Sequence, residues 1–149
     1  MSDKERGYVY RADIFASASQ VWWALTDREP LARWCAPDVQ ITARRGGLFR
    51  ASVDKITEFE AQIDVFEPGR RLRLLYLPHA TLPPAGTVMV DDFLLYAFAD
   101  RTMVRLLGSG VPATPEWDTQ YRRLRVSWQH AMSRLKVLVE QEVKGGHGS

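Results

Sequence analysis

The chain has 149 residues, of which 46% are hydrophobic and 26% charged, with a formal net charge of +2. This hydrophobic content excludes the disordered class, and the length fits a single domain, residues 1–149, with a sizeable core. A net charge this small, without a basic stripe between aromatic residues, argues against nucleic-acid binding. No apolar run approaches the length of a membrane span, and residues 1–7 lack the apolar core of a signal peptide. We therefore expect a cytoplasmic protein without a membrane partner, with residues 1–7 and 145–149 disordered.

The N-terminal part of the chain predicts one strand and two short helices. Alternate residues from Tyr8 to Ile14 are apolar, which is typical of a strand, here over residues 8–15. Residues 17–20 offer a helix start, and Val21, Trp22 and Leu25 form a short apolar face behind it. A second helix has Pro30 in its first turn and ends before Pro37.

The middle of the chain predicts six further strands. They cover residues 39–44, 48–53, 58–66, 71–77, 88–98 and 102–109, and turn residues such as Gly46–Gly47, Asp54–Lys55 and Pro68–Gly69 separate them. Links this short imply antiparallel neighbours, because parallel strands need long crossovers. Residues 78–86 form the longest loop.

A long amphipathic helix is expected over residues 115–143. Pro115 suits its first turn, and Gly145 and Gly146 follow its end. The apolar residues recur in steps of three and four: Trp117, Tyr121, Leu124, Trp128, Ala131, Leu135 and Leu138. The element order β-α-α-β6-α then predicts an α+β fold, in which a seven-stranded antiparallel sheet curves around the long helix.

Several segments carry a resemblance to a known family. They are residues 14–16 (Ile-Phe-Ala), 21–27 (Val-Trp-Trp-Ala-Leu-Thr-Asp), 31–37 (Leu-Ala-Arg-Trp-Cys-Ala-Pro), 46–50, 65–72 and 102–110, together with Trp128 in the long helix. In combination they resemble the START-like, Bet v 1-like helix-grip superfamily, and within it the branch named for the activator of Hsp90 ATPase. The resemblance implies a helix-grip fold that encloses apolar ligands, although such a fold alone does not settle function.

The sequence departs from the family pattern at three places. Cys35 stands where the family commonly repeats a tryptophan, which implies a smaller side chain in the pocket wall. Gly108 stands where a histidine is common on the last strand, so one polar group is missing. Residues 78–86 match no family segment, and we expect them to lie over the cavity mouth.

The expected ligand site is a cavity between the sheet and the long helix. Asp91 and Asp92 interrupt an apolar strand, and the register of Leu94 and Tyr96 predicts that Asp92 points inward as a polar anchor. The alternative is that the strand is irregular there and both aspartates reach water. The predicted cavity residues are Trp22, Trp34, Phe49, Tyr76, Asp92, Tyr96, Trp117, Tyr121, Leu124 and Trp128.

No metal site, cofactor or set of catalytic residues is expected. His79 and His130 have no acid or cysteine at ligand spacing in the sequence. Ser109 lacks the strand-to-helix turn of a nucleophile and a downstream acid–histidine pair.

Three functions compete at this level. The first is binding of a hydrophobic or aromatic small molecule, motivated by the many aromatic residues on the inner faces. The second is a cyclase or hydrolase acting on a polyketide-like substrate, with Asp92 as acid or base. It is weakened because no second titratable group takes an inward position. The third is a co-chaperone-like interaction domain, for which no chaperone partner is expected here, whereas a homodimer stays open.

Overall fold

The computed structural model describes residues 4–52 and 58–145. Its elements follow the predicted order, with one short 3-10 helix ahead of the long helix. They are β1 (Glu5–Ile14), α1 (Ala18–Thr26), α2 (Arg28–Trp34), β2 (Asp38–Ile41), β3 (Leu48–Ser52), β4 (Glu58–Glu67), β5 (Arg71–Tyr76), β6 (Val90–Ala97), β7 (Thr102–Pro112), η2 (Pro115–Trp117) and α3 (Asp118–Lys144).

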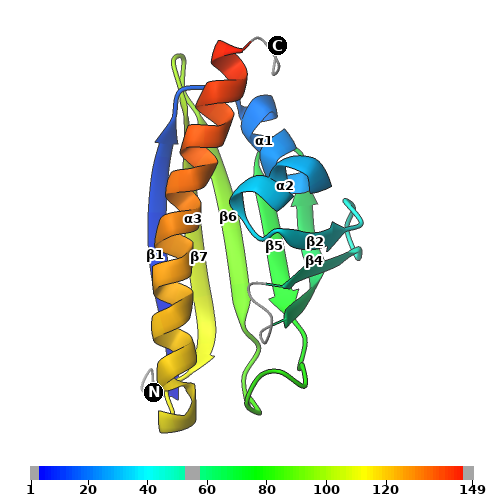
Figure 1. The fold of residues 1–149 in the computed structure, drawn as a ribbon, viewed down its shortest axis with the longest axis vertical. Coiled ribbons are helices and arrows are strands. Elements are labelled where there is room, and N and C mark those ends of the chain that lie inside the picture. Colours follow the sequence, from blue (N-terminus) through cyan, green and yellow to red (C-terminus); the bar gives the residue numbers. More distant parts are fainter. Residues whose placement is uncertain (1–3, 53–57, 146–149) are drawn as a thin grey trace.

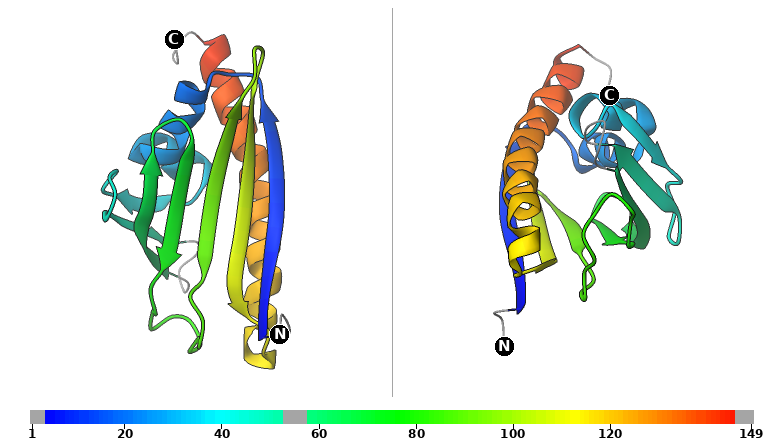
Figure 2. Two further views of the ribbon diagram at one scale, coloured as in Figure 1. Left: turned by 180° about the vertical axis from the view of Figure 1, so that it is seen from behind. Right: turned by 60° about the horizontal axis from the view of Figure 1, so that its bottom comes forward.

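The seven strands form one antiparallel sheet in the order β1-β7-β6-β5-β4-β3-β2. Helix α3 lies along β1 and β7 on the inner face of the sheet, and α1 and α2 lie on that same face (Figure 1). Figure 2 shows the sheet curving around this side of the molecule. The α+β helix-grip fold predicted from the sequence is therefore confirmed.

Three strand ends differ from the expected ones by three residues, and one of them is the end of β2, which lies at Ile41 rather than at residue 44. Strand β1 begins at Glu5, because Glu5 and Arg6 pair with the end of β7, so the prediction of disorder over residues 1–7 is wrong for this part. Strand β7 continues to Pro112 for the same reason. The predicted turn at Asp54–Lys55 and the disorder expected over residues 1–3 and 146–149 fall outside the described residues.

Side-chain caps define where the two short helices begin. Ser17 accepts a hydrogen bond from the backbone N–H of Gln20, and the Gln20 side chain accepts one from the Ser17 N–H, which forms a complete capping box for α1. Asp27 accepts from the Glu29 N–H at the start of α2. Arg33 of α2 then pairs with Glu142 of α3 at 2.9 Å, so the short helices are tied to the C-terminal half of α3.

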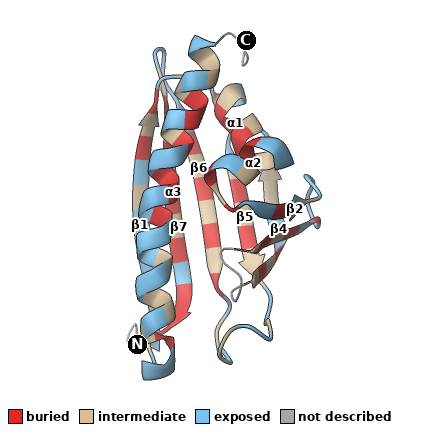
Figure 3. Ribbon diagram, in the orientation of Figure 1, coloured by how far each residue is buried: buried red, intermediate tan, exposed pale blue. Residues whose placement is uncertain are grey.

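The core lies between the inner face of the sheet and only part of α3. Buried α3 side chains begin at Trp128 and continue to Val139, whereas no residue from Asp118 to Ser127 is buried (Figure 3). The side of α3 turned away from the sheet is largely exposed. Within the described residues, no helix is both long and apolar enough to cross a membrane. The N-terminal half of α3 therefore stands over the sheet without filling the space beneath it.

Candidate functional site

A cavity of about 660 Å³ lies beneath this less buried half of α3. Strands β1, β3, β4, β5, β6 and β7 contribute its floor, the segment after α2 contributes one side, and α3 contributes its roof. Its volume is within the range of small-molecule sites, and most of its wall is apolar. The larger apolar side chains in the wall are Phe49, Phe59, Met89, Val111, Leu124 and Trp128.

Asp91 is the acidic residue in this wall. Its side chain belongs to β6, is 1% exposed, and accepts a hydrogen bond of 2.5 Å from the hydroxyl of Tyr8 on β1. Burial raises the pKa of Asp91 to about 6, and the hydroxyls of Tyr8 and Tyr76 oppose part of that rise. The carboxyl group is thus poised to exchange a proton near neutral pH.

The other titratable groups beside Asp91 are held in their neutral forms. Burial raises the pKa of Tyr8 and of Tyr76, and the nearby charge of Asp91 raises both further. Burial likewise raises the pKa of Cys35 to about 12. These three groups therefore line the cavity in their neutral forms beside the carboxyl group of Asp91.

One edge of the cavity is polar and follows a single stripe of α3. Arg123, His130 and Arg134 belong to this stripe, and all three are exposed. Arg134 is oriented by a hydrogen bond of 2.9 Å from its Nε to the carbonyl of Trp34. A ligand in the cavity would therefore meet a carboxyl group in the interior and positive charge at this edge. The stripe consists of Gln120, Arg123, Ser127, His130 and Arg134.

The structure brings four of the ten predicted cavity residues to the cavity wall: Phe49, Tyr76, Leu124 and Trp128. They come from β3, β5 and α3, which are far apart in the sequence, so their convergence supports the predicted register of those elements. Cys35 also lines the cavity, which agrees with its expected place in the pocket wall.

Five of the predicted residues pack elsewhere. Trp34 is in the core, where its indole N–H donates to the carbonyl of Ala24, and Trp22 packs edge-on against Phe66. Tyr96 is 40% exposed. Trp117 donates to the carbonyl of Pro84 and Tyr121 to that of Gly7, so neither side chain overhangs the cavity.

The expectation that Asp92 points inward is wrong. Asp92 lies on the outer face of the sheet, where Arg71 donates two hydrogen bonds to it at 3.0 and 2.8 Å. Its neighbours of the same parity, Leu94 and Tyr96, are also outside, whereas Asp91, Phe93 and Leu95 are buried. Sequence alternation was ambiguous because both faces of β6 carry apolar residues. The signal that was missed is Phe93, which contacts Trp34 and Trp128.

A second group of polar residues lies away from the cavity. No acid stands at ligand spacing from His79 in the sequence, but Glu58 and Glu60 of β4 lie beside His79 in the fold. Within the described residues, these three form the group of side chains arranged closely enough to hold a metal ion. A strand and a distant loop create this arrangement, which spacing in the sequence does not reveal.

Solved structures with the same fold are numerous. Protein MLL2253 from Mesorhizobium loti is 22% identical with a TM-score of 0.78, and the match covers 91% of this chain and 98% of that one. The Aha1 dimer from Colwellia psychrerythraea is 20% identical with a TM-score of 0.76, covering 91% and 96%. DynU16, a putative protein in the dynemicin biosynthetic locus, is 19% identical with a TM-score of 0.71, covering 94% and 48%. At these identities the likeness establishes the fold.

No curated protein matches the chain. A family model does match it, over residues 15–140, which is most of its length. The match begins just after β1 and ends near the end of α3, so it includes every element that lines the cavity except β1. The chain therefore belongs to the family described as activator of Hsp90 ATPase homolog 1-like proteins.

Proposed function

We propose that this protein binds a hydrophobic or aromatic small molecule in the cavity between α3 and the sheet. The observation that carries the proposal is the cavity itself, of about 660 Å³, with a mostly apolar wall and one buried carboxyl group. A well-packed core leaves few voids larger than a water molecule. A space of this size in a small protein is consistent with a ligand site rather than with imperfect packing.

The buried carboxyl group suggests how a ligand is oriented. Burying a charged group is costly unless it is paired, and in the described part of the chain no basic side chain contacts Asp91. A ligand that donates a hydrogen bond to Asp91 would supply that partner. The aromatic wall would hold its apolar part, and its more polar end would lie at the α3 edge with Arg123 and Arg134.

An enzyme is the second candidate, and one observation favours it. Asp91 has a pKa of about 6, which suits a general acid or base at neutral pH, and the hydroxyls of Tyr8 and Tyr76 lie beside it as donors. DynU16, which shares the fold, belongs to a biosynthetic locus. A cyclase-type or hydrolase-type reaction on a polyketide-like substrate would use Asp91, rather than Asp92, to move the proton. A homodimer, as in the Colwellia structure, remains a prediction for this chain.

The binding proposal is tested with Nile red, an uncharged apolar dye that fluoresces when it leaves water. Ala51 lies in the cavity wall on β3, and Ser52 beside it points to the opposite face of the sheet. We expect Ala51→Trp to fill the cavity and abolish saturable dye binding, whereas Ser52→Trp adds the same side chain outside and retains it. Equal binding by both variants, or none by the wild type, would remove the basis of the proposal.

A further inference from the structure

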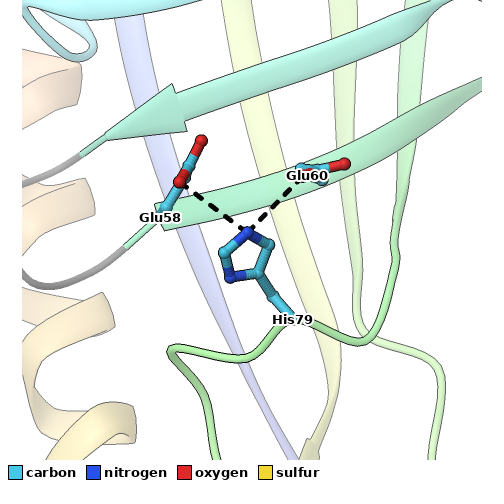
Figure 4. Close-up of side chains that lie close together, drawn as sticks. All are labelled: Glu58, Glu60 and His79. Atoms are coloured by element: carbon cyan, nitrogen blue, oxygen red, sulfur yellow. Dashed lines mark ion pairs between the residues drawn. The ribbon is translucent and has the colours of Figure 1, made fainter.

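The outer face of the sheet carries a cluster of three ligand-type side chains that is separate from the cavity. Glu58 and Glu60 project from β4, and His79 reaches them from the loop between β5 and β6 (Figure 4). The His79 Nε2 atom lies 3.8 Å from Oε2 of Glu58 and 3.5 Å from Oε1 of Glu60. The three ligand atoms all lie within 4.8 Å of one another.

These separations are too long for direct hydrogen bonds, which span about 2.7–3.2 Å between nitrogen and oxygen. They suit a metal ion placed between the three atoms. Zinc–nitrogen and zinc–oxygen bonds of about 2.0–2.2 Å put neighbouring ligands of a tetrahedral site roughly 3.4 Å apart. The ring nitrogen therefore stands at about the distance from both carboxylates that a shared ion requires.

The other ring nitrogen of His79 is held by Thr81. The Nδ1 atom lies 3.0 Å from the Thr81 hydroxyl, and that hydroxyl donates to the carbonyl of Glu58 at 3.0 Å. An Nδ1–H can therefore donate to the Thr81 oxygen and leave the Nε2 lone pair for an ion. When no ion is bound, the proton can instead lie on Nε2, and Nδ1 then accepts a hydrogen bond from the Thr81 N–H at 3.2 Å. Support of the second ring nitrogen is typical of histidines that ligate metals.

The backbone around the cluster fixes the loop to β4. The N–H of Leu77 donates to the carbonyl of Glu60 at 2.8 Å, and the N–H of Glu58 donates to the Thr81 hydroxyl at 3.2 Å. The two carboxylates and the imidazole are thus brought together without needing an ion to order the chain. This preorganisation lowers the conformational cost of binding.

Arg50 of β3 is the competing cation. Its Nε atom lies 3.4 Å from Oε1 of Glu58 and 4.0 Å from Oε1 of Glu60. That Nε atom is buried and makes no hydrogen bond within the described residues, so it acts on the two carboxylates through its charge rather than through a hydrogen bond. The charge of Arg50 should weaken cation binding without blocking it. A variant that removes this charge should therefore bind the cation more tightly.

We propose that Glu58, Glu60 and His79 form a binding site for one divalent transition-metal ion, for which Zn²⁺ fits the mixed imidazole and carboxylate ligands. The side chains of His79, Glu58 and Glu60 are 15%, 34% and 29% exposed, so water completes the coordination. The ion would fasten the loop of residues 78–86 to β4. Trp117 already fastens the other part of that loop through the carbonyl of Pro84.

Calorimetric titration of the full-length protein with Zn²⁺ tests the proposal. We expect one saturable site, and His79→Gln and Glu60→Gln should each lower the affinity by at least about tenfold. His130→Gln and His147→Gln are the controls, because the former alters an exposed histidine on α3 and the latter one near the C-terminus. Both controls should bind like the wild type. Arg50→Gln should bind more tightly, since it removes the competing charge.

The proposal is overturned by no saturable binding in the wild type, by unchanged affinity in His79→Gln, or by an anomalous zinc peak in crystals at another position. Thermal unfolding with a chelator present must give the same midpoint for His79→Gln and the wild type, and Zn²⁺ should then raise the midpoint of the wild type only. A drop for His79→Gln in chelator would make the imidazole structural and would also count against the proposal. The Nile red assay measures binding in the cavity, whereas the zinc titration measures binding at the outer face. Failure of one proposal can therefore be distinguished from failure of the other.

Discussion

Tyr8 reaches Asp91 by passing over a glycine on the strand between them. Tyr8 on β1 and Asp91 on β6 are both opposite Gly108 on β7, and the phenol donates to the carboxyl group at 2.5 Å. A Cβ atom at position 108 would lie 2.1 Å from Cζ of the Tyr8 ring. The absence of a side chain at Gly108 is therefore what permits the contact between Tyr8 and Asp91.

Gly108→Ala should separate these two residues. The added methyl group must displace the Tyr8 ring, which removes a donor that lowers the pKa of Asp91, so that pKa should rise above about 6. We also expect a loss of about 1–3 kcal/mol in the free energy of unfolding, because the site is overpacked. Carboxyl ¹³C chemical shifts followed against pH measure the first effect, and urea titration measures the second.

The matched control is Gly86→Ala in the loop, where an added Cβ has nothing within 4 Å. This variant should leave both the Asp91 titration and the unfolding free energy close to the wild-type values. If Gly108→Ala behaves in the same way, the Tyr8 ring does not depend on the glycine.

Asp91→Asn should make the protein more stable at alkaline pH. The folded-state pKa of Asp91 is about 6, above the ordinary value of 3.8, because burial disfavours the ionised carboxylate. The folded protein therefore loses stability as pH rises from about 4 to about 6. Above that window the cost is at most about 3 kcal/mol. The variant should thus unfold at higher urea concentration than the wild type at pH 8 and lose this advantage at pH 4.

Asp92→Asn provides the comparison on the outer face. It breaks the ion pair with Arg71, in which the side chains are 14% and 34% exposed, and should cost no more than about 1 kcal/mol. Its effect at pH 8 should be destabilising, opposite in sign to that of Asp91→Asn. The same sign for both variants would contradict the assignment of the two carboxyl groups to opposite faces.

The fold was predictable from the sequence because its signals are local and repeated. Residues 17–20 indicate a helix start, which the structure confirms with Ser17 as the cap of α1. Short links between strands leave little choice but antiparallel neighbours, and the apolar stripe of α3 identifies the face that meets the sheet.

The cavity was less predictable because periodicity reports which face is inward and not whether an inward residue touches another side chain or empty space. Trp34 and Trp128 both point inward, yet only Trp128 lines the cavity. Tyr8 belongs to the site through its contact with Asp91, which depends on strand order and on Gly108. His79 meets Glu58 only because a loop returns to an earlier strand.

Trp34→Phe should separate a core role from a cavity role. The indole N–H of Trp34 donates to the carbonyl of Ala24 at 2.7 Å in the buried interior, and phenylalanine would leave that carbonyl without its donor. The cost should be about 1–3 kcal/mol in urea titration. Nile red affinity should be unchanged, because Trp34 does not line the cavity. A large loss of dye binding without a loss of stability would mean that Trp34 belongs to the ligand site.

The two halves of α3 should respond differently to loss of a leucine. Leu135 is 0% exposed in the packed half, so Leu135→Ala leaves a new void and should cost about 2–5 kcal/mol, with dye binding retained by the folded protein. Leu124 already borders an empty space and is only partly buried, so Leu124→Ala creates little new void.

We expect Leu124→Ala to cost less than about 1.5 kcal/mol while weakening Nile red binding, since it removes apolar contact area from the cavity wall. Tyr121 is unsuitable for this comparison, because its hydroxyl is bonded to the carbonyl of Gly7 and its ring contacts Arg6. Urea titration beside dye titration therefore separates the two leucine variants. Equal destabilisation by both, with dye binding unaffected in each, would mean that α3 is packed along its whole length and that the dye binds elsewhere.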